Sequence, residues 1–332
     1  MTRCFAIVCA IGSIITSASA AEPDRETIQR SVERGLVVLE RGAKAYPSHQ
    51  TCFACHHQTL PMLAMTAARN AGLRFDAELF QAQRDFTRKN FNERKARLAK
   101  GEHVGGRAAT VSYGLWALRL AGDKPDELTE AMTSYLLSVQ LPDGRWKPQS
   151  IRPPLESSFV SCTVLVAWTL REFASDAQRE QVTPAIERAK AWLATASLDE
   201  QEDLNFALWG ERLLGGSDER INSLKQRVLD AQQPDGGWRQ KQDLTSDAYA
   251  TGQTLFVLSE IGTPATDAAH HKGIEFLLRT QEADGSWHVV TRSKPIQPWF
   301  DNGDPHDKDQ FISITASGWA TAALARSLGP AR

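Results

Sequence analysis

The pattern Gln-x-x-Asp-Gly-x-Trp occurs three times in this sequence, at residues 140–146, 232–238 and 281–287. Each copy separates two stretches in which apolar residues recur with the period of a helix. The three tryptophans are 92 and 49 positions apart, so the first interval spans about two repeats and predicts a degenerate copy near Trp192. Repeated spacing of this kind predicts a chain built from stacked copies of one supersecondary unit.

Within each copy, the Asp-Gly dipeptide suits a tight turn, because glycine accepts the left-handed backbone conformation that other residues avoid. The tryptophan adds a large apolar face and an indole N–H that can donate to a turn carbonyl. We therefore predict a structural role for these motifs and no chemistry of their own.

Turn signals divide the chain into six pairs of predicted helices, each an amphipathic helix followed by a more apolar one. The amphipathic helices are predicted at 26–43, 78–97, 126–140, 179–195, 217–232 and 267–281. The apolar helices are predicted at 58–71, 108–121, 158–173, 203–214, 247–261 and 311–328. A helix that is apolar on most sides must be covered on most sides, so the apolar set is predicted to be the inner one. The sequence thus predicts an all-α fold, a single (α/α)6 toroid over residues 21–332.

The predicted connections from inner to outer helices are short, and most of those from outer to inner helices are long. The long connections cover 45–57, 100–108, 146–157 and 288–310. All of them fall on one rim, at the N-terminal ends of the inner helices. Since long loops on a rigid scaffold carry much of protein function, we expect the functional site on that rim.

The repeated motif resembles the QW motif of the squalene cyclase and protein prenyltransferase superfamily, and the resemblance covers roughly residues 26–329. It implies an α/α toroid with a central cavity and an isoprenoid or other apolar substrate. The Asp-x-Asp-Asp motif that supplies the acid in class II triterpene cyclases does not occur in this sequence. Asp247, in the segment Ser-Asp-Ala-Tyr-Ala, is similar to the catalytic aspartate of oxidosqualene cyclases. It also lies where a helix N-cap is expected, and capping is the favoured interpretation.

The N-terminus has the pattern of a secretory signal peptide over residues 1–20. Arg3 precedes an apolar run at 5–15, and Ala-Ser-Ala at 18–20 predicts cleavage after Ala20. The run is too short for a membrane-spanning helix, so we expect a periplasmic or secreted protein with no integral membrane segment. The formal net charge of -2, without blocks of one sign, argues against a nucleic acid partner.

Three cysteines remain after signal cleavage, and two of them form the segment Cys52-Phe-Ala-Cys55-His56. Cys-x-x-Cys-His is the attachment signal for haem c, in which the thiols bind the porphyrin and the histidine binds iron. Two thiolates with His56 or His57 also suit zinc or copper. A disulfide or an inert role is the remaining alternative. The segment also resembles a class of exported proteins that combine this signal with squalene-cyclase-like repeats.

A second polar cluster occupies residues 301–310, directly before the last predicted inner helix. Ring closure places that helix beside the first one, so His306 is expected near Cys55 as a sixth haem ligand or a metal ligand. His57 and Met62 are alternatives for the sixth position. Asp307 is a candidate acid for an apolar substrate in the cavity, and a solvated loop with a helix cap is the structural alternative.

Trp116, Trp168, Trp209 and Phe256 each lie six residues before a small residue that ends a predicted inner helix. They are expected to form one aromatic level, which serves packing or stabilises a cationic intermediate. Three functions follow as hypotheses. The first is an exported haem protein with a redox, electron-transfer or sensing role and a redox partner protein. The second is a terpenoid cyclase-like or transferase-like enzyme for an apolar small molecule, and the third is a zinc- or copper-binding or non-catalytic scaffold.

Overall fold

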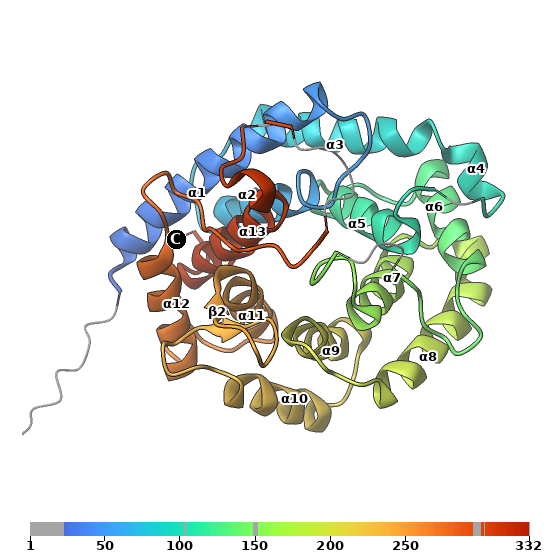
Figure 1. Ribbon diagram of the computed structural model, residues 1–332. Coiled ribbons are helices and arrows are strands. Elements are labelled where there is room, and N and C mark those ends of the chain that lie inside the picture. Colours follow the sequence, from blue (N-terminus) through green and yellow to red (C-terminus); the bar gives the residue numbers. More distant parts are fainter. Residues whose placement is uncertain (1–22, 103, 149–151, 295–299, 302, 332) are drawn as a thin grey trace, which may run out of the picture.

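The computed structural model describes residues 23–102, 104–148, 152–294, 300–301 and 303–331. The expected signal peptide at 1–20 lies outside the described residues. Figure 1 shows the described helices as two concentric rings, with each inner helix flanked by outer ones. This arrangement confirms the predicted α/α toroid. None of the described helices is long and apolar enough to span a membrane.

The outer ring holds the amphipathic helices and the inner ring the apolar ones, as expected. The outer helices are α1 (Arg25–Ala45), α3 (Ala77–Asn92), α6 (Glu127–Ser138), α8 (Arg179–Thr195), α10 (Asp218–Asp230) and α12 (Ala268–Thr280). The inner helices are α2 (Thr59–Asn70), α5 (Arg107–Leu120), α7 (Phe159–Phe173), α9 (Gln201–Leu214), α11 (Ala248–Glu260) and α13 (Gln310–Ser327).

Burial differs between the two rings in the way that their sequences require. Every residue from Ile312 to Ala325 in the inner helix α13 is buried, because other helices cover it on all sides. In the outer helix α10 the fully buried residues are Leu224 and Val228, which lie four positions apart on one face. An outer helix therefore needs one apolar stripe, whereas an inner helix has no solvent-facing side.

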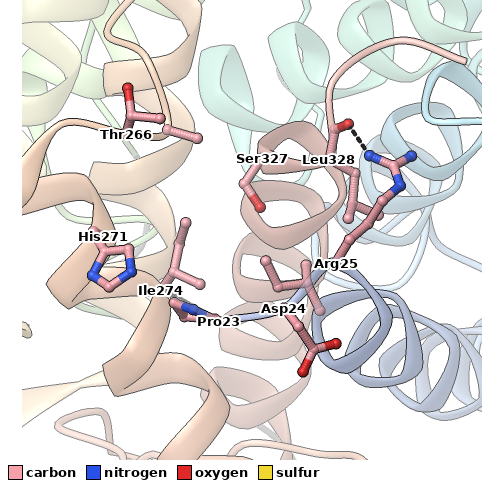
Figure 2. Close-up of a pocket in the computed structure, with 10 residues that line it drawn as sticks. Pro23, Asp24, Arg25, Thr266, His271, Ile274, Ser327 and Leu328 are labelled. Carbon is pink, nitrogen blue, oxygen red and sulfur yellow. Dashed lines mark hydrogen bonds between the residues drawn. The ribbon is translucent and has the colours of Figure 1, made fainter. Parts of the chain in front are cut away.

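The ring closes where the last inner helix meets the beginning of the chain. Helix α13 packs against both α2 and α1. At the seam, Arg25 donates a hydrogen bond to the carbonyl oxygen of Leu328 at 2.5 Å, beside a cavity of about 390 Å³ (Figure 2). The two ends of the described chain are thus joined by main-chain and side-chain contacts.

The three Gln-x-x-Asp-Gly-x-Trp motifs make the same set of bonds. Each tryptophan donates its indole N–H to a carbonyl at the end of the preceding outer helix, as Trp238 does to Val228 at 2.7 Å. Each glutamine donates to the motif glycine carbonyl and to the next outer helix, as Gln232 does to Gly236 and Ala269 at 2.8 and 2.7 Å. The structural role predicted for the motifs is confirmed.

Two of the motif glycines show why no side chain fits at the glycine position of the motif. A Cβ on Gly236 would lie 2.6 Å from the carbonyl oxygen of Lys272, and one on Gly285 would lie 2.5 Å from that of Arg34. Both glycines also have positive φ angles, of 89° and 93°. The turn therefore lies directly against the next outer helix.

Three details differ from the sequence-based expectation. The outer helix predicted at 78–97 ends at Asn92, and a short helix α4 (Lys95–Ala99) follows it. Trp192 lies inside α8, so the connection at 196–200 lacks a degenerate copy of the motif. A two-residue antiparallel pair joins β1 (Trp238–Arg239) to β2 (Ser246–Asp247), because the motif backbone continues extended beside the next inner helix.

Candidate functional site

The segment with both cysteines precedes the first inner helix on the rim where the long connections gather. Residues 55–58 form a turn that leads into α2. The Gln58 side chain accepts a hydrogen bond from the Ala54 N–H at 2.7 Å and donates one to Gln83 at 3.2 Å. These buried bonds hold the segment against α3.

A cavity of about 310 Å³ opens beside this turn. Cys52, Cys55 and His56 all line it, and residues 104–106 and 110 at the start of α5 form another wall. Arg94, Arg152 and Glu156 also line it, so the cavity combines thiols, an imidazole and fixed charges.

His56 is one of the buried polar groups that line this cavity. Its side chain is buried between the rings of His57 and Phe311, whose centroids lie 4.5 and 4.9 Å away. Its Nδ1 atom has no hydrogen-bond partner among the described residues. Burial first, and the neighbouring His57 and Arg152 next, lower the pKa of His56 well below its usual value. The imidazole is therefore neutral at pH 7, as a metal or haem ligand must be.

The two thiols have different surroundings. Cys52 is exposed, and its Sγ lies 3.5 Å from the Tyr46 hydroxyl. Cys55 is buried, and its Sγ donates to a carboxylate oxygen of Glu156 at 3.5 Å. Burial, followed by the charge of Glu156, raises the pKa of Cys55 well above its usual value. All three cysteines of the described chain are free thiols.

The second polar cluster reaches this segment through Asp304. Its carboxylate pairs with Nε2 of His57, and both side chains are buried. The two segments are thus neighbours on the rim, as ring closure requires. His306 lies in a different cluster from His56, however. Its ring stacks on His288 at 4.5 Å, and its Nε2 contacts the Ser286 hydroxyl at 2.8 Å.

The candidate acids Asp247 and Asp307 occupy the same rim. Asp247 is the N-cap of α11 and accepts hydrogen bonds from the Ala250 N–H at 2.9 Å and from Gln240 at 3.0 Å. Burial raises the pKa of Asp247 to about 6. Asp307 is exposed and lies in the short helical turn before α13. Neither carboxylate lines the cavity beside the cysteines.

A carboxyl group that the sequence did not single out lies inside the inner ring. Glu202, in the first turn of α9, is 2% exposed. It accepts hydrogen bonds from the Tyr249 hydroxyl at 2.9 Å and from Gln253 at 2.7 Å, both on α11. The Ser161 hydroxyl on α7 is a further hydrogen-bonding neighbour of this carboxyl group and lowers its pKa. Burial raises the pKa of Glu202 to about 8, so the group is largely protonated at pH 7.

Sequence reasoning missed Glu202 for a local reason. Glu-Asp at 202–203 reads as the acidic first turn that helix dipoles favour in many helices. The predicted inner helix began at 203, which placed Glu202 in a connection. One sequence signal could have identified Glu202: it is a carboxylate at the start of a helix that is expected to be covered on all sides.

The predicted aromatic level is present in the C-terminal half of the inner helices. Trp116 contacts Trp168, Trp209 and Trp319, with ring centroids 5.4 to 5.9 Å apart. Phe256 joins Trp209 and Trp319 at 5.5 and 5.3 Å. Five inner helices each contribute one ring, and all five rings are buried. The centre of the toroid is therefore filled with aromatic side chains at this level.

A second cavity, of about 320 Å³, lies on the outer side of this aromatic level. Trp116, Trp168, Trp209 and Phe256 form its apolar wall. Its mouth carries three arginines and a glutamate from the C-terminal ends of inner helices, namely Arg69, Arg119, Arg326 and Glu260. An apolar molecule with a polar or anionic end matches such a lining.

Metal-ligand geometry appears elsewhere on the rim. Among the described residues, the group of three ligand side chains that converges within 4.8 Å consists of Glu282, His288 and His306. The Cys52–His57 segment does not bring three ligand atoms together at that spacing in the described chain. The seam cavity of Figure 2 is lined by residues at the start of α1, in and before α12, and at the end of α13, and the bond from Arg25 to Leu328 lies beside it.

Comparison with known proteins agrees with this architecture. The family model of the prenyltransferase alpha-alpha toroid domain matches residues 38–201 and 204–297. The chain belongs to this family. A stretch of 77 residues is 38% identical to ent-copalyl diphosphate synthase from Streptomyces sp. (strain KO-3988), and it covers 22% of this chain but only 15% of that protein.

Solved structures of the same fold include a terpene cyclase and a glycosidase. The type II terpene cyclase MstE from Scytonema superposes with a TM-score of 0.61 at 15% identity, covering 92% of this chain and 99% of the cyclase. A glycosidase variant has a TM-score of 0.62 at 10% identity, covering 93% and 98% of the two chains. MstE is also solved with geranylgeranyl dihydroxybenzoate as its substrate. At these identities the likeness establishes the fold alone.

Proposed function

We propose that this member of the toroid family is a terpene cyclase-like enzyme that protonates an apolar, isoprenoid-type molecule inside the ring. The observation that carries the proposal is Glu202, a buried carboxyl group that burial keeps protonated near neutral pH. Tyr249, Gln253 and Ser161 surround this carboxyl group and hold it in place inside the ring. A protonated acid inside a toroid of this family is the chemical feature that alkene protonation requires.

The aromatic level supplies the second part of the chemistry. Gln253, which bonds to Glu202, lies one turn before Phe256 on α11. Tyr113 stacks on Trp116 at 5.8 Å, and its pKa is raised by burial and by the charge of Glu202. The acid and the aromatic rings therefore occupy adjacent levels. The faces of tryptophan and phenylalanine rings stabilise a neighbouring cation.

The proposed reaction conserves atoms. The Glu202 carboxyl donates its proton to one carbon of a C=C bond, whose π electrons form the new C–H bond. The positive charge left on the other carbon is stabilised by the aromatic faces until a second double bond closes a ring. Loss of a proton from the product cation to the Glu202 carboxylate restores the acid. Because Glu202 is 2% exposed, entry of the substrate requires the aromatic level to open toward it.

The test compares the protein with two glutamine variants on the same helix. All-trans polyprenes such as squalene and geranylgeraniol are incubated with the purified chain, and cyclised products are identified by mass spectrometry. Glu202→Gln is expected to lower turnover by about 100-fold or more, because it removes the acidic proton but keeps the shape of the side chain. Glu211→Gln, at the solvent end of α9 beside Arg220, is the matched control and keeps full turnover. Equal turnover in the Glu202→Gln variant would contradict the proposal.

Asp247 and Asp307 remain the alternative acids and are tested in the same assay. Asp247→Asn keeps an N-cap acceptor for α11, so a loss of turnover without a loss of stability would assign the proton to Asp247. Asp307→Asn changes an exposed group and is expected to leave turnover unchanged.

We propose covalent haem c attachment as the second candidate function, favoured by the cavity beside the first inner helix. Both thiols of the Cys-x-x-Cys-His segment and the neutral His56 line that one cavity. His56 would bind the iron, and the thiols of Cys52 and Cys55 would hold the porphyrin. The bound group would supply one-electron redox chemistry to a partner protein, in the exported compartment that the predicted signal peptide would give.

Expression with a cytochrome c maturation system tests this candidate. A Soret band that stays with the polypeptide under denaturing conditions is expected for the unaltered chain and is lost in Cys52→Ala. Cys162→Ala is the matched control, because Cys162 is buried in α7 away from the segment. A chain without covalent haem under these conditions removes the candidate.

A further inference from the structure

The two ends of the long connection between α12 and α13 meet on the N-terminal rim. One follows α12 and carries Glu282 and His288, and the other precedes α13 and carries His306. A carboxylate oxygen of Glu282 and one ring nitrogen from each histidine lie within 4.8 Å of one another. Two imidazoles and one carboxylate are a common ligand set for divalent transition metals.

The hydrogen bonds around these histidines determine which ring nitrogen is available. The Ser286 hydroxyl donates its hydrogen to Asp284 at 2.6 Å, so it accepts the N–H of His306 Nε2 at 2.8 Å. Nε2 of His288 lies 2.9 Å from a carboxylate oxygen of Asp309 and donates to it. In both rings Nε2 therefore carries the hydrogen, and Nδ1 keeps its lone pair.

Metal-binding histidines usually have this arrangement, with the second ring nitrogen bonded to a carboxylate or another acceptor. Asp309 is itself held in place, because its other oxygen accepts the Thr291 N–H at 2.9 Å. The two rings are nearly parallel, at an angle of 10°, with centroids 4.5 Å apart. The Nε2 bonds leave both Nδ1 atoms free to bind, but the lone pair of each Nδ1 lies in its own ring plane, so the two stacked rings must turn toward each other to hold one ion.

The backbone at His306 adds an independent observation. His306 has φ 78° and Asp307 has φ 43°, which are left-handed conformations that residues with a side chain rarely adopt. The hydrogen bond from Asp309 N–H to the His306 carbonyl, at 2.8 Å, closes this turn. The turn positions the His306 ring over His288.

We propose that Glu282, His288 and His306 bind one divalent transition metal ion, with zinc as the probe, through the Glu282 carboxylate and the two Nδ1 atoms. Three protein ligands leave a fourth position of a tetrahedral site for water or another small ligand. The ion would tie the long connection after α12 to the turn that precedes α13. The site is distinct from the cavity beside the cysteines and does not depend on the proposed cyclase chemistry.

The full chain is stripped with a chelator and titrated with zinc against a chromophoric competitor, and cobalt replaces zinc for visible spectroscopy. One ion per chain is expected, with cobalt bands that lack the charge-transfer absorption of a thiolate ligand. His288→Ala and Glu282→Gln are each expected to weaken zinc binding at least tenfold. Both residues are exposed, so the variants are expected to fold, which circular dichroism checks.

Two controls make the result specific. His271→Ala removes a surface histidine that faces a single carboxylate, Glu275, at 3.8 Å, and it is expected to leave zinc affinity unchanged. Cys52→Ala combined with Cys55→Ala removes the competing thiol segment and is also expected to leave affinity unchanged. Absence of zinc binding, or binding that survives His288→Ala and disappears in the double cysteine variant, would overturn the proposal.

Discussion

The three tryptophan motifs and the Cys52–His57 segment occupy equivalent connections, from an outer helix to the next inner one, and differ in how completely their polar atoms are bonded. In each motif the glutamine amide and the indole N–H both have partners on outer helices. In the first connection, His56 Nδ1 is buried without a hydrogen-bond partner in the described chain, beside a cavity of about 310 Å³.

An unbonded buried polar atom costs stability, and a ligand that bonds to it recovers part of that cost. The motif connections, whose glutamine and indole groups are hydrogen-bonded, stabilise the toroid. A position with an unbonded polar atom offers a ligand a hydrogen bond. The following predictions test this difference, in order of expected effect.

Removing a motif tryptophan is expected to have the largest effect. Trp238 is fully buried, and its indole N–H bonds to Val228. Trp238→Ala should lower the free energy of unfolding by about 3–5 kcal/mol, because it leaves a large cavity. Urea denaturation measures the change. A loss below about 1 kcal/mol would mean that the motif does not stabilise the ring.

The next largest effect concerns pH and Glu202. The pKa of this group is about 8 in the folded protein and near its model value of 4.5 when unfolded, so folding retains a proton between these pH values. The contribution of Glu202 to the free energy of unfolding is therefore fully present below about pH 4.5. It falls by roughly 1 kcal/mol per pH unit as the pH rises toward 8. Glu202→Gln has no such proton. The difference in unfolding free energy between the two proteins, measured at pH 5, 6, 7 and 8, should change by about 3 kcal/mol.

A constant difference across that pH range would show that Glu202 is ionised like an exposed carboxylate. Glu211→Gln serves again as the control, since it is the same substitution on the same helix, at a carboxylate that pairs with Arg220 on α10.

Ring closure is tested by the last motif glutamine. Gln281 donates to the carbonyl of Ser31 on α1 at 2.9 Å, whereas Gln232 makes the equivalent bond to the adjacent helix α12. Gln281→Ala should destabilise the protein by about 1–2 kcal/mol, because a buried carbonyl loses its partner. Gln232→Ala should cost a similar amount. A much smaller loss for Gln281→Ala, measured by thermal unfolding, would indicate that the seam between α12 and α1 contributes little.

The smallest effect is expected at His56. His56→Phe keeps an aromatic ring between His57 and Phe311 and removes the unbonded Nδ1 atom. Unfolding free energy should change by less than about 1 kcal/mol, because replacing an unsatisfied polar group by an apolar one of similar shape is nearly neutral. A loss above about 2 kcal/mol would make His56 a structural residue and remove the contrast with the motifs.

Much of the fold could be predicted because its signals are local. The period of apolar residues located all twelve main helices, and the greater apolar content of one set identified the inner ring. The break after Asn92 and the lack of a motif copy at 196–200 were not predicted, because both depend on how neighbouring outer helices pack. The aromatic level was predicted from spacing alone, although its fifth member, Trp319, was not included.

The candidate site was predicted only in part. Ring closure correctly brought the segment around residue 304 to the Cys52–His57 turn, through the pair of Asp304 with His57. The ring of His306 stacks on His288, a contact that the sequence did not predict, and the left-handed turn at 306–307 leads into it. Spacing along a chain does not report the direction of a side chain in an irregular loop.

The sequence by itself determined the class of fold, the order of the two helix layers and the rim on which the long connections lie. Those properties follow from hydrophobic period and turn chemistry, which act between residues close in the chain. Only the tertiary structure decided that Glu202 is enclosed and protonated and that Glu282, His288 and His306 converge. Both results depend on desolvation and on contacts between distant segments, and these forces exist only once the ring has closed.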